Sequence, residues 1–300
     1  MHLLTQVNHI KFNYIVYSTN EILFCLYNET QRKGSVINMN KGKITLSFDD
    51  ARKDTFHVFR DILLPRRLKG VVYVPSGYVE VNYNNPKDVG FNGVMSKKEL
   101  DWIEDQSSFE ISGHGYMHKN DFDDISKGIE KLKEWYPNFR DFGLASPRSE
   151  IHKEYVDAHE KEFRALGIQY VRGGRNFSGN VAYRRFLSLM ARITKSKKLF
   201  LKCYRDSAMS VLNSYYLSAI IIHKKTTLNQ VKAIVDFCIN SQRWAILEFH
   251  GIDKVGSKEY EEIFCWSEED FVKLCDYLQY QQDSGKLDVE NPIEIIKSLN

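Results

Sequence analysis

KITLSFDD, residues 43–50, is the stretch that decides the fold: a short apolar strand that ends in two adjacent carboxylates. A helical pattern of apolar residues follows between Phe56 and Leu63 and stops at Pro65. Residues 70–74 then again have the composition of a strand. The segment therefore opens a unit in which a strand, a helix and a second strand follow one another.

The same alternation continues along the chain. A capping-box spacing at Ser96 and a serine cap at Ser267 mark two helix starts, and a further helix is predicted over residues 152–165. Strand-like runs recur at residues 110–112, 142–145, 168–171, 217–222 and 244–249. Alternation over roughly 250 residues predicts an α/β fold, with a mainly parallel sheet covered by helices, open or closed into a barrel. In such folds the chemistry lies at the carboxyl ends of the strands.

The domain organisation follows from where the alternation of strands and helices begins and where it becomes irregular. Residues 1–42 alternate apolar and polar in short bursts, which predicts an N-terminal strand extension packed on the barrel. Residues 43–300 form the barrel itself. Within it, residues 173–215 are the least regular part and are interpreted as an insertion. We find no internal repeat and no linker, so one decorated domain is expected.

Composition excludes several classes of protein. Lysine and arginine number 42 and aspartate and glutamate 39, so the net charge of +3 gives no indication of nucleic-acid binding. No run of about 18 uncharged apolar residues exists, so no membrane span is expected. The N-terminus lacks the pattern of a secretory signal, which predicts a cytoplasmic protein. Five widely spaced cysteines without a CxxC pair indicate reduced thiols rather than disulfides or a cysteine zinc cluster. The oligomeric state stays open.

Two polar motifs follow predicted strands. Asp49 and Asp50 are either a solvated turn or a metal ligand beside a general base, an arrangement that a divalent cation makes tolerable. His114 and His118 have the i, i+4 spacing that brings two imidazoles onto one side of a helical turn. That spacing alone is weak evidence. With Asp50 the two imidazoles form a set that leaves metal positions open for water and substrate.

A third polar position ends the last predicted strand. His250 follows residues 244–249 and precedes a glycine, so its ring is expected to face the same edge of the sheet as the other motifs. Glu248 projects to the same side of the strand. A buried carboxylate needs a partner, and His250 or an arginine would serve.

Four motifs resemble those of one family in their order and spacing. They are Leu-Ser-Phe-Asp-Asp at residues 46–50, the His114–His118 pair, Ala-Ser-Pro at residues 145–147 and Phe-His-Gly at residues 249–251. They resemble the polysaccharide deacetylases, the NodB-homology proteins of carbohydrate esterase family 4, over roughly residues 43–300. The resemblance implies a distorted (β/α) barrel and a divalent metal, usually Zn²⁺. It also implies hydrolysis of an N-acyl group, typically N-acetyl, on an amino sugar.

The resemblance also implies roles for individual residues. Asp50, His114 and His118 match the metal ligands of the family, Asp49 its general base and His250 its general acid. A metal held by three ligands lowers the pKa of the water it holds toward ~7, so the base need collect only one proton. The backbone N–H after the motif proline, which here belongs to Arg148, would share the oxyanion with the metal.

The sequence departs from the family pattern at the third motif. Many members carry an arginine that orients the base there, whereas this chain has Ala145. Arg172, at the end of another predicted strand, is a replacement that we expect to reach Asp49; alternatively it is a solvated arginine. Gly115 replaces a small hydroxyl residue between the two histidines. Arg52 either binds a sugar carboxylate or phosphate or is simply exposed.

Other residues are candidates for substrate contact. Among the aromatic side chains, Tyr116 is singled out for stacking on a sugar because it lies between the two histidines, although a core or rim position is the commoner role. Glu248 is placed with the substrate group as well. Basic residues 184–185 and 195–198 either attract an anionic carrier, such as a nucleotide or lipid diphosphate, or form a solvated helix face, and the second interpretation is preferred.

The leading functional hypothesis is a metal-dependent amidohydrolase that deacylates an amino-sugar glycan or an activated-sugar precursor in the cytoplasm, such as an O-antigen or other surface-polysaccharide intermediate. Two alternatives stay open within the family: a metal-containing barrel that binds glycan with impaired catalysis, and a deformylase acting on a carrier-linked sugar. A metal-dependent phosphoesterase is a weaker third possibility, because it needs a second metal and more ligands than these motifs provide.

Overall fold

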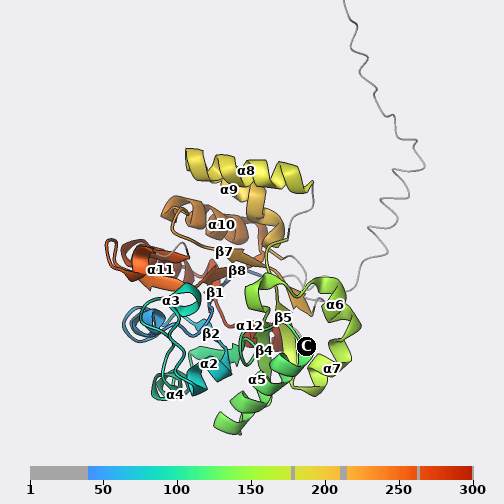
Figure 1. Ribbon diagram of the computed structural model, residues 1–300. Coiled ribbons are helices and arrows are strands. Elements are labelled where there is room, and N and C mark those ends of the chain that lie inside the picture. The colour runs from blue at the N-terminus through green and yellow to red at the C-terminus, as the bar shows by residue number, and fades with distance from the viewer. Residues whose placement is uncertain (1–39, 177–179, 210–214, 262–263, 299–300) are drawn as a thin grey trace, which may run out of the picture. The chain divides into compact units, whose positions relative to one another are not determined.

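The computed structural model describes residues 40–298, with the exception of residues 177–179, 210–214 and 262–263 (Figure 1). The strand extension predicted for residues 1–42 therefore lies outside the described residues, except at its C-terminal end. Within the described part of the chain, no helix combines the length and the apolar character needed to cross a bilayer. The cysteines of this part are buried and free.

A parallel sheet forms the centre of the described chain (Figure 1). Its strands are β1 (Gly42–Phe48), β2 (Gly70–Val74), β3 (Phe109–Gly113), β4 (Phe142–Ala145), β5 (Ile168–Arg172), β6 (Tyr216–Leu217), β7 (Ala219–Ile221), β8 (Trp244–Phe249) and β11 (Leu287–Val289). They lie in the order β6-β5-β4-β3-β2-β1-β8-β7, and all of these pairings are parallel. β11 pairs with the first half of β1, and β2 pairs with the second half. A separate parallel pair joins β9 (Gly251–Asp253) to β10 (Cys265–Ser267).

The sheet is nearly closed into a barrel. β6 and β7 occupy its two ends, yet only Ser218 separates them in the chain. The Ala219 N–H donates to the Gly174 carbonyl (3.3 Å), which links the start of β7 to the loop after β5. The single strand expected over residues 217–222 was therefore wrong, because this apolar run supplies both edges of the closing seam. The predicted distorted α/β barrel is confirmed.

Helices cover the outside of the barrel, except for the last helix, which contributes Ile295 to the inside (Figure 1). They are α2 (Ser76–Glu80), α3 (Pro86–Val89), α4 (Lys97–Glu104), α5 (Phe122–Trp135), α6 (Lys153–Ala158), α7 (Glu160–Ala165), α8 (Val181–Thr194), α9 (Lys197–Tyr204), α10 (Leu228–Ser241), α11 (Glu268–Asp283) and α12 (Pro292–Lys297). The capping box predicted at Ser96 is present on α4. The structure differs from two of the predicted helices. The first is a π-helical segment over Val58–Leu63, and the helix predicted over residues 152–165 is interrupted at His159.

The faces of the strands divide the core in two. Along β1, Ile44, Leu46 and Phe48 belong to the large apolar cluster completed by the helices, whereas Thr45 and Ser47 are buried on the other face. A smaller cluster fills the inside of the barrel: Val71, Tyr73, Ala145, Tyr170, Leu217, Ala219, Trp244, Ile246 and Ile295. Polar groups share this interior, so they must find hydrogen-bond partners there.

One polar network crosses the interior around Glu110 of β3. The Tyr170 hydroxyl and the Ser112 hydroxyl both donate to Glu110 Oε1 (2.7 Å each), and the Ile293 N–H donates to Oε2 (3.1 Å). The Tyr73 hydroxyl lies 2.7 Å from that of Tyr170. Burial raises the pKa of Glu110 to about 7, although the hydrogen bonds from Tyr170 and Ser112 act in the opposite direction.

This shift predicts how stability depends on pH. The folded state holds the Glu110 proton more tightly than the unfolded chain, where the pKa is 4.5. The associated stabilisation is complete below about pH 4.5 and is lost as the pH rises through 7, by about 3 kcal/mol in total. In Glu110→Gln we expect this loss between pH 5 and 8 to disappear, as measured by urea unfolding. The exposed Glu130→Gln is the control, and equal pH slopes for wild type and Glu110→Gln would contradict the assignment.

Candidate functional site

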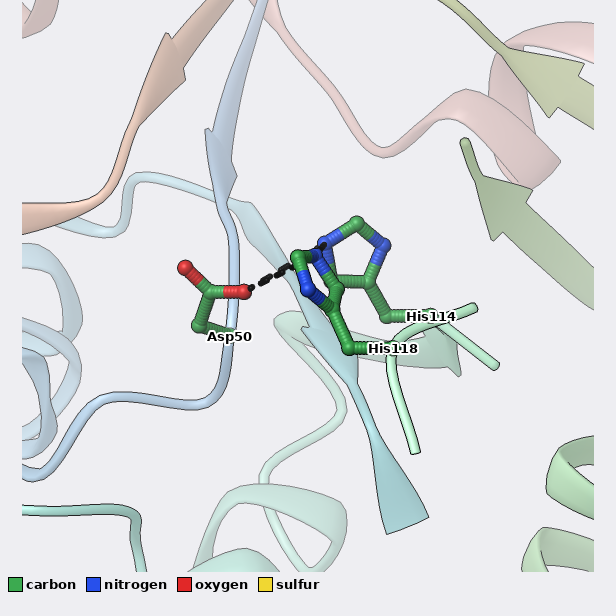
Figure 2. A group of neighbouring side chains, drawn as sticks. All are labelled: Asp50, His114 and His118. Carbon is green, nitrogen blue, oxygen red and sulfur yellow. Dashed lines mark hydrogen bonds and ion pairs between the residues drawn. The ribbon is translucent and has the colours of Figure 1, made fainter. Parts of the chain in front are cut away.

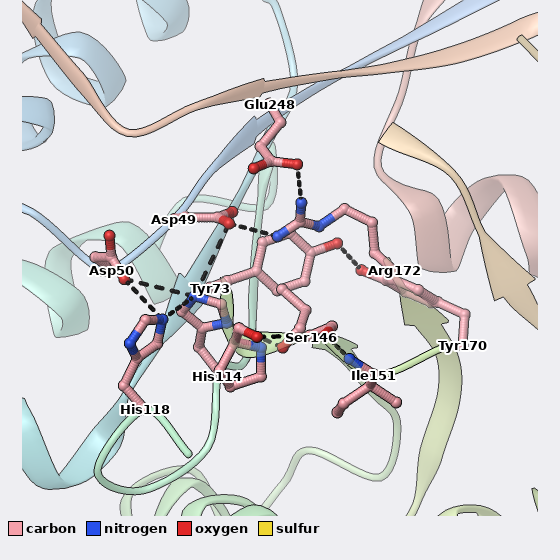
Figure 3. Close-up of polar contacts among 12 residues, drawn as sticks. Asp49, Asp50, Tyr73, His114, His118, Ser146, Ile151, Tyr170, Arg172 and Glu248 are labelled. Carbon is pink, nitrogen blue, oxygen red and sulfur yellow. Dashed lines mark hydrogen bonds and ion pairs between the residues drawn. The ribbon is translucent and has the colours of Figure 1, made fainter. Parts of the chain in front are cut away.

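The polar residues singled out from the sequence gather at the carboxyl end of the barrel (Figure 3). Each sits at or just beyond the end of a parallel strand. Asp49 and Asp50 follow β1, His114 and His118 follow β3, Arg172 ends β5, and Glu248 and His250 lie at the end of β8. Parallel strands bring these ends to one rim, which is why residues 200 positions apart along the chain can meet.

A sharp turn places the two adjacent carboxylates. The Asp49 N–H donates to the Phe249 carbonyl (2.9 Å) and continues the pairing of β1 with β8. Asp50 (φ 67°) and Ala51 (φ 46°) then adopt the left-handed conformation and end the strand abruptly. Since this region costs a non-glycine residue roughly 1–2 kcal/mol, the turn is held by its surroundings rather than by local preference.

A loop, not a helical turn, presents the two histidines, so the helical spacing argument was wrong in its geometry. The loop is organised by Asp124 in the first turn of α5, whose carboxylate accepts from the N–H groups of Tyr116 (2.9 Å), Met117 (2.9 Å) and Lys119 (3.0 Å). Gly115 has φ 75°, and a Cβ there would lie 2.6 Å from Asp124 Oδ2. Asp124 is a site-forming residue that the sequence analysis missed; its place in a helix first turn was the available signal.

Asp50, His114 and His118 converge (Figure 2). Asp50 Oδ1 lies 3.5 Å from His114 Nε2 and 3.4 Å from His118 Nε2, and the two imidazole nitrogens are 3.1 Å apart. Ligands bound to one zinc ion at about 2.0–2.1 Å in tetrahedral geometry are separated by roughly 3.3 Å. His114 Nδ1 is 2.9 Å from the Ala145 carbonyl, which fixes the ring with Nε2 toward the group. The three residues fit a single divalent cation.

The protonation states of Asp50 and His118 agree with a metal-ligand set. His114 differs: burial lowers its pKa, but the hydrogen bond with Asp50 and the charges of Asp49 and Asp50 raise it overall. Burial alone would raise the pKa of Asp50, but a hydrogen bond with His114 and the nearby imidazoles hold it below its usual range. Burial, followed by the charge of His114, lowers the pKa of His118 to about 4. An ionised carboxylate and a neutral imidazole are the forms that bind metal.

A second group lies beside the first and centres on Arg172, which is fully buried. Its Nη2 donates to Asp49 Oδ2 (2.5 Å), and its Nη1 donates to Glu248 Oε2 (Figure 3). The contact with Asp49 expected from the sequence is therefore present, and the partner of Glu248 is this arginine. Acceptor atoms of Asp49 and Glu248 and a nitrogen of His250 lie within 4.8 Å of one another. Burial raises the pKa of Glu248, partly offset by Arg172.

A cavity of about 330 Å³ opens over both groups. Its lining includes Asp49, Asp50, both histidines of the loop, Arg148, Glu248 and His250. Asp49 Oδ1 and His250 Nδ1 are buried atoms with no hydrogen-bond partner among the described residues. Both residues line the cavity, so a molecule bound there could supply the missing hydrogen-bond partners.

Two residues considered for substrate contact are placed differently. The Tyr116 hydroxyl donates to Glu80, the Lys127 ammonium lies 3.7 Å from the ring centroid, and Tyr116 is not among the residues lining the cavity. Arg52 is buried and paired with Asp54 (2.9 Å) and Glu259 (3.1 Å), so both alternatives considered for it, binding of an anionic sugar group and simple exposure, were wrong. Arg148 does line the cavity, with φ 54°.

This chain has distant structural matches among known proteins. No protein-family model and no curated protein matches the chain. The matched solved structures include family 4 carbohydrate esterases and deacetylases, the family that the sequence motifs resemble. The catalytic domain of a peptidoglycan N-acetylglucosamine deacetylase from Eubacterium rectale is 12% identical, over 88% of this chain and 94% of that one, with a TM-score of 0.41.

Two further structures show the same level of similarity. A CE4 esterase from Streptococcus mutans is 12% identical over 87% of this chain and 89% of that chain, with a TM-score of 0.43. The Streptococcus pyogenes deacetylase PplD is 15% identical over 53% of this chain and 65% of that chain, with a TM-score of 0.37. All three TM-scores lie below 0.5, so the residues of this chain have to carry any functional conclusion.

Metal affinity tests the first group. Asp50→Asn and His118→Ala each remove one of three converging donor atoms, and we expect either variant to bind Zn²⁺ at least ~100-fold more weakly than the wild type in a chelator competition titration. His152→Ala, an exposed histidine outside the site, is the matched control. Unchanged affinity in both site variants would show that the cation binds elsewhere.

Proposed function

We propose that this chain is a polysaccharide deacetylase of carbohydrate esterase family 4, a metal-dependent hydrolase that removes an N-acyl group, most commonly N-acetyl, from an amino sugar. One observation carries the proposal. A carboxylate fixed by a buried arginine, Asp49, adjoins three converging metal-type ligands, and His250 lines the same cavity. Asp50, His114 and His118 would hold the cation, with Zn²⁺ as the proposed metal.

The residues of the chain divide the chemistry between them. A divalent cation held by Asp50, His114 and His118 would act as a Lewis acid and would lower the pKa of water. Asp49 accepts a proton from the attacking water while the water oxygen forms a bond to the acyl carbon. Arg172 keeps Asp49 oriented through its 2.5 Å hydrogen bond. The backbone N–H of Arg148 is proposed as an oxyanion donor.

Cleavage of the C–N bond requires a proton for the departing amine, because an amine leaves poorly as an anion. His250 is proposed to donate it, which yields the free amino sugar and the carboxylic acid. Glu248 lies beside this proposed acid, with an acceptor atom within 4.8 Å of a His250 nitrogen. The altered third motif is thus compensated: the arginine that orients the base comes from β5 instead of the segment after β4.

This geometry weighs against the other functional classes. A barrel that only binds glycan needs neither a fixed base nor a histidine beside that base in the same cavity. A two-metal phosphoesterase would use Asp49 and Glu248 for a second cation, but Arg172 already forms an ion pair with each of them. A deformylase uses the same residues and is separated from a deacetylase only by the acyl group released.

We extend the proposal to an activated precursor of a cell-surface polysaccharide, such as an O-antigen intermediate, deacylated in the cytoplasm. The buried, free cysteines of the described residues are compatible with a reducing compartment.

Acid release tests the reaction. Zinc-loaded protein is expected to release acetate, or formate if the acyl group is formyl, from N-acylated amino sugars. Asp49→Asn should lower kcat by roughly 10²–10⁴-fold, because the base is lost, while zinc content is retained. Arg172→Ala should lower kcat by about tenfold or more at unchanged zinc content, with partial recovery in Arg172→Lys.

Two results would refute this function. Full activity in Asp49→Asn would exclude Asp49 as the base. Tight glycan binding without acid release from any acylated sugar would instead favour the binding barrel.

A further inference from the structure

A second cavity, of about 350 Å³, adjoins the one over the catalytic residues. The two share Arg148, Ser149, Ile221 and Glu248 in their linings, so they form parts of one depression. Beyond the shared residues the lining is basic and aromatic. It adds Arg175, Arg192, Tyr204 and His223.

The arginines of this second cavity differ from the other arginines near the site. Arg52 and Arg172 are each paired with two carboxylates. Arg148, Arg175 and Arg192 form no ion pair with any carboxylate of the described residues. The only carboxylate of the lining, that of Glu248, is already bound to Arg172.

Neutral oxygens hold two of these side chains in place. Arg175 Nη1 donates to the Tyr204 hydroxyl (3.2 Å), and Arg192 Nε donates to the Ser188 carbonyl (3.3 Å). Burial and the nearby Arg192 charge lower the pKa of His223. The cavity is therefore a region of uncompensated positive charge in which guanidinium donors remain free.

We propose that this second cavity is a subsite for a phosphate or diphosphate group joined to the acylated sugar. The inference rests on the proposed deacetylase function and defines its substrate class. Guanidinium groups bind phosphate oxygens through paired hydrogen bonds. A phosphate monoester or a diphosphate carries about two negative charges and several free oxygens, which suits three arginines that line one cavity better than a single carboxylate does. The sugar then lies between this subsite and the cation ligands.

Charge around the subsite supports an anionic substrate. Residues 181–207, which contain α8 and α9, carry eight lysines and arginines and a single acidic residue, Asp206. The whole chain carries a net charge of only +3, so the rest of it is slightly acidic. A one-signed surface beside a cavity raises the local concentration of the opposite charge.

Substrate discrimination tests the subsite. The ratio of kcat/KM for N-acetylglucosamine 1-phosphate to that for neutral N-acetylglucosamine oligomers should fall about tenfold in Arg175→Gln and again in Arg192→Gln, as expected when a charged hydrogen bond is lost. Arg60→Gln, an exposed arginine far along the chain, is the control. To identify the source of the phosphate, kcat/KM is also measured for an acylated nucleoside diphosphate sugar and for an acylated prenyl-phosphate-linked sugar in vesicles. An unchanged ratio in both variants overturns the proposal.

A binding measurement separates this proposal from the proposed function. Glucose 1-phosphate has no acyl group. In calorimetry it should bind the wild type and the Asp50→Asn variant equally well. Its binding should be lost in the Arg175→Gln/Arg192→Gln double variant. Loss in Asp50→Asn instead would mean that phosphate binds the cation, and the subsite is refuted. Binding with this pattern in a protein that hydrolyses no acylated sugar retains the subsite and refutes the deacetylase.

A different observation concerns the outer face of α8. This helix packs on α9, which in turn packs on α10 (Figure 1). Leu187 and Ala191 are buried on its inner face. On the opposite face Phe186, Leu189 and Ile193 are 57%, 49% and 66% exposed. Their i, i+3, i+7 spacing makes a continuous apolar stripe on the solvent side, and such stripes mark interaction surfaces.

We infer that this stripe lies on the surface of an anionic lipid bilayer. An apolar helix face bordered by lysine and arginine is the pattern of an interfacial helix. The basic residues of the 181–207 segment supply the attraction to anionic headgroups. Arg192 lies on α8 and also lines the second cavity, so the bound helix would bring the phosphate subsite next to the membrane surface.

Vesicle flotation tests this surface. The full chain should float with phosphatidylglycerol vesicles and not with phosphatidylcholine vesicles, and binding should weaken as salt is raised. Phe186→Ser and Ile193→Ser should each weaken binding roughly tenfold, whereas Tyr280→Ser, 65% exposed on α11, should not. No flotation overturns the inference. So does a wild-type dimer in sedimentation that Phe186→Ser converts to monomer, because a second copy would then cover the stripe.

Discussion

The site depends on one buried guanidinium between two carboxylates. Asp49 and Glu248 are almost completely buried, and taking an ionised carboxylate out of water costs several kcal/mol unless it is paired. Arg172 pairs with both from the end of β5, across the barrel from β1 and β8. It is itself fully buried, so the three charges are mutually dependent. This ion triad fixes the position of Asp49, and through it the arrangement of the proposed base relative to the cation ligands.

The burial of Arg172 also explains why polar groups occupy the inside of the barrel. Arg172 lies 5.0 Å from the ring centroid of Tyr73, whose hydroxyl joins Tyr170 and then Glu110 near the opposite end. The rings need space, and Gly143 provides it: a Cβ there would lie 2.1 Å from Tyr170 Cζ. Hydrogen-bonded aromatic and charged groups therefore run through the interior, from Glu110 to Arg172, and hold Arg172 in position at the site.

Much of this arrangement could be predicted from the sequence because parallel strands carry their chemistry at one end. The strands at residues 142–145 and 244–249 match the predicted runs, and the reach of Arg172 to Asp49 follows from two strand ends on one rim. The rest depends on distant partners. The split at Ser218 within an apolar run is set by barrel closure, and Arg52 is withdrawn from the surface by Glu259, 207 positions away. The local sequence pattern gives no information on barrel closure or on the pairing of Arg52 with Glu259.

The contrast between paired and unpaired arginines gives the second cavity its significance. Like charges held close together repel, and the fold elsewhere offsets them, as at Arg52 and Arg172. Packing does not require Arg175 and Arg192 to be cationic, since neutral polar residues could make their hydrogen bonds to Tyr204 and Ser188. Their charge contributes electrostatic attraction instead, directed at a cavity beside the proposed reaction centre. That attraction is of use only if the molecule entering the site is itself an anion.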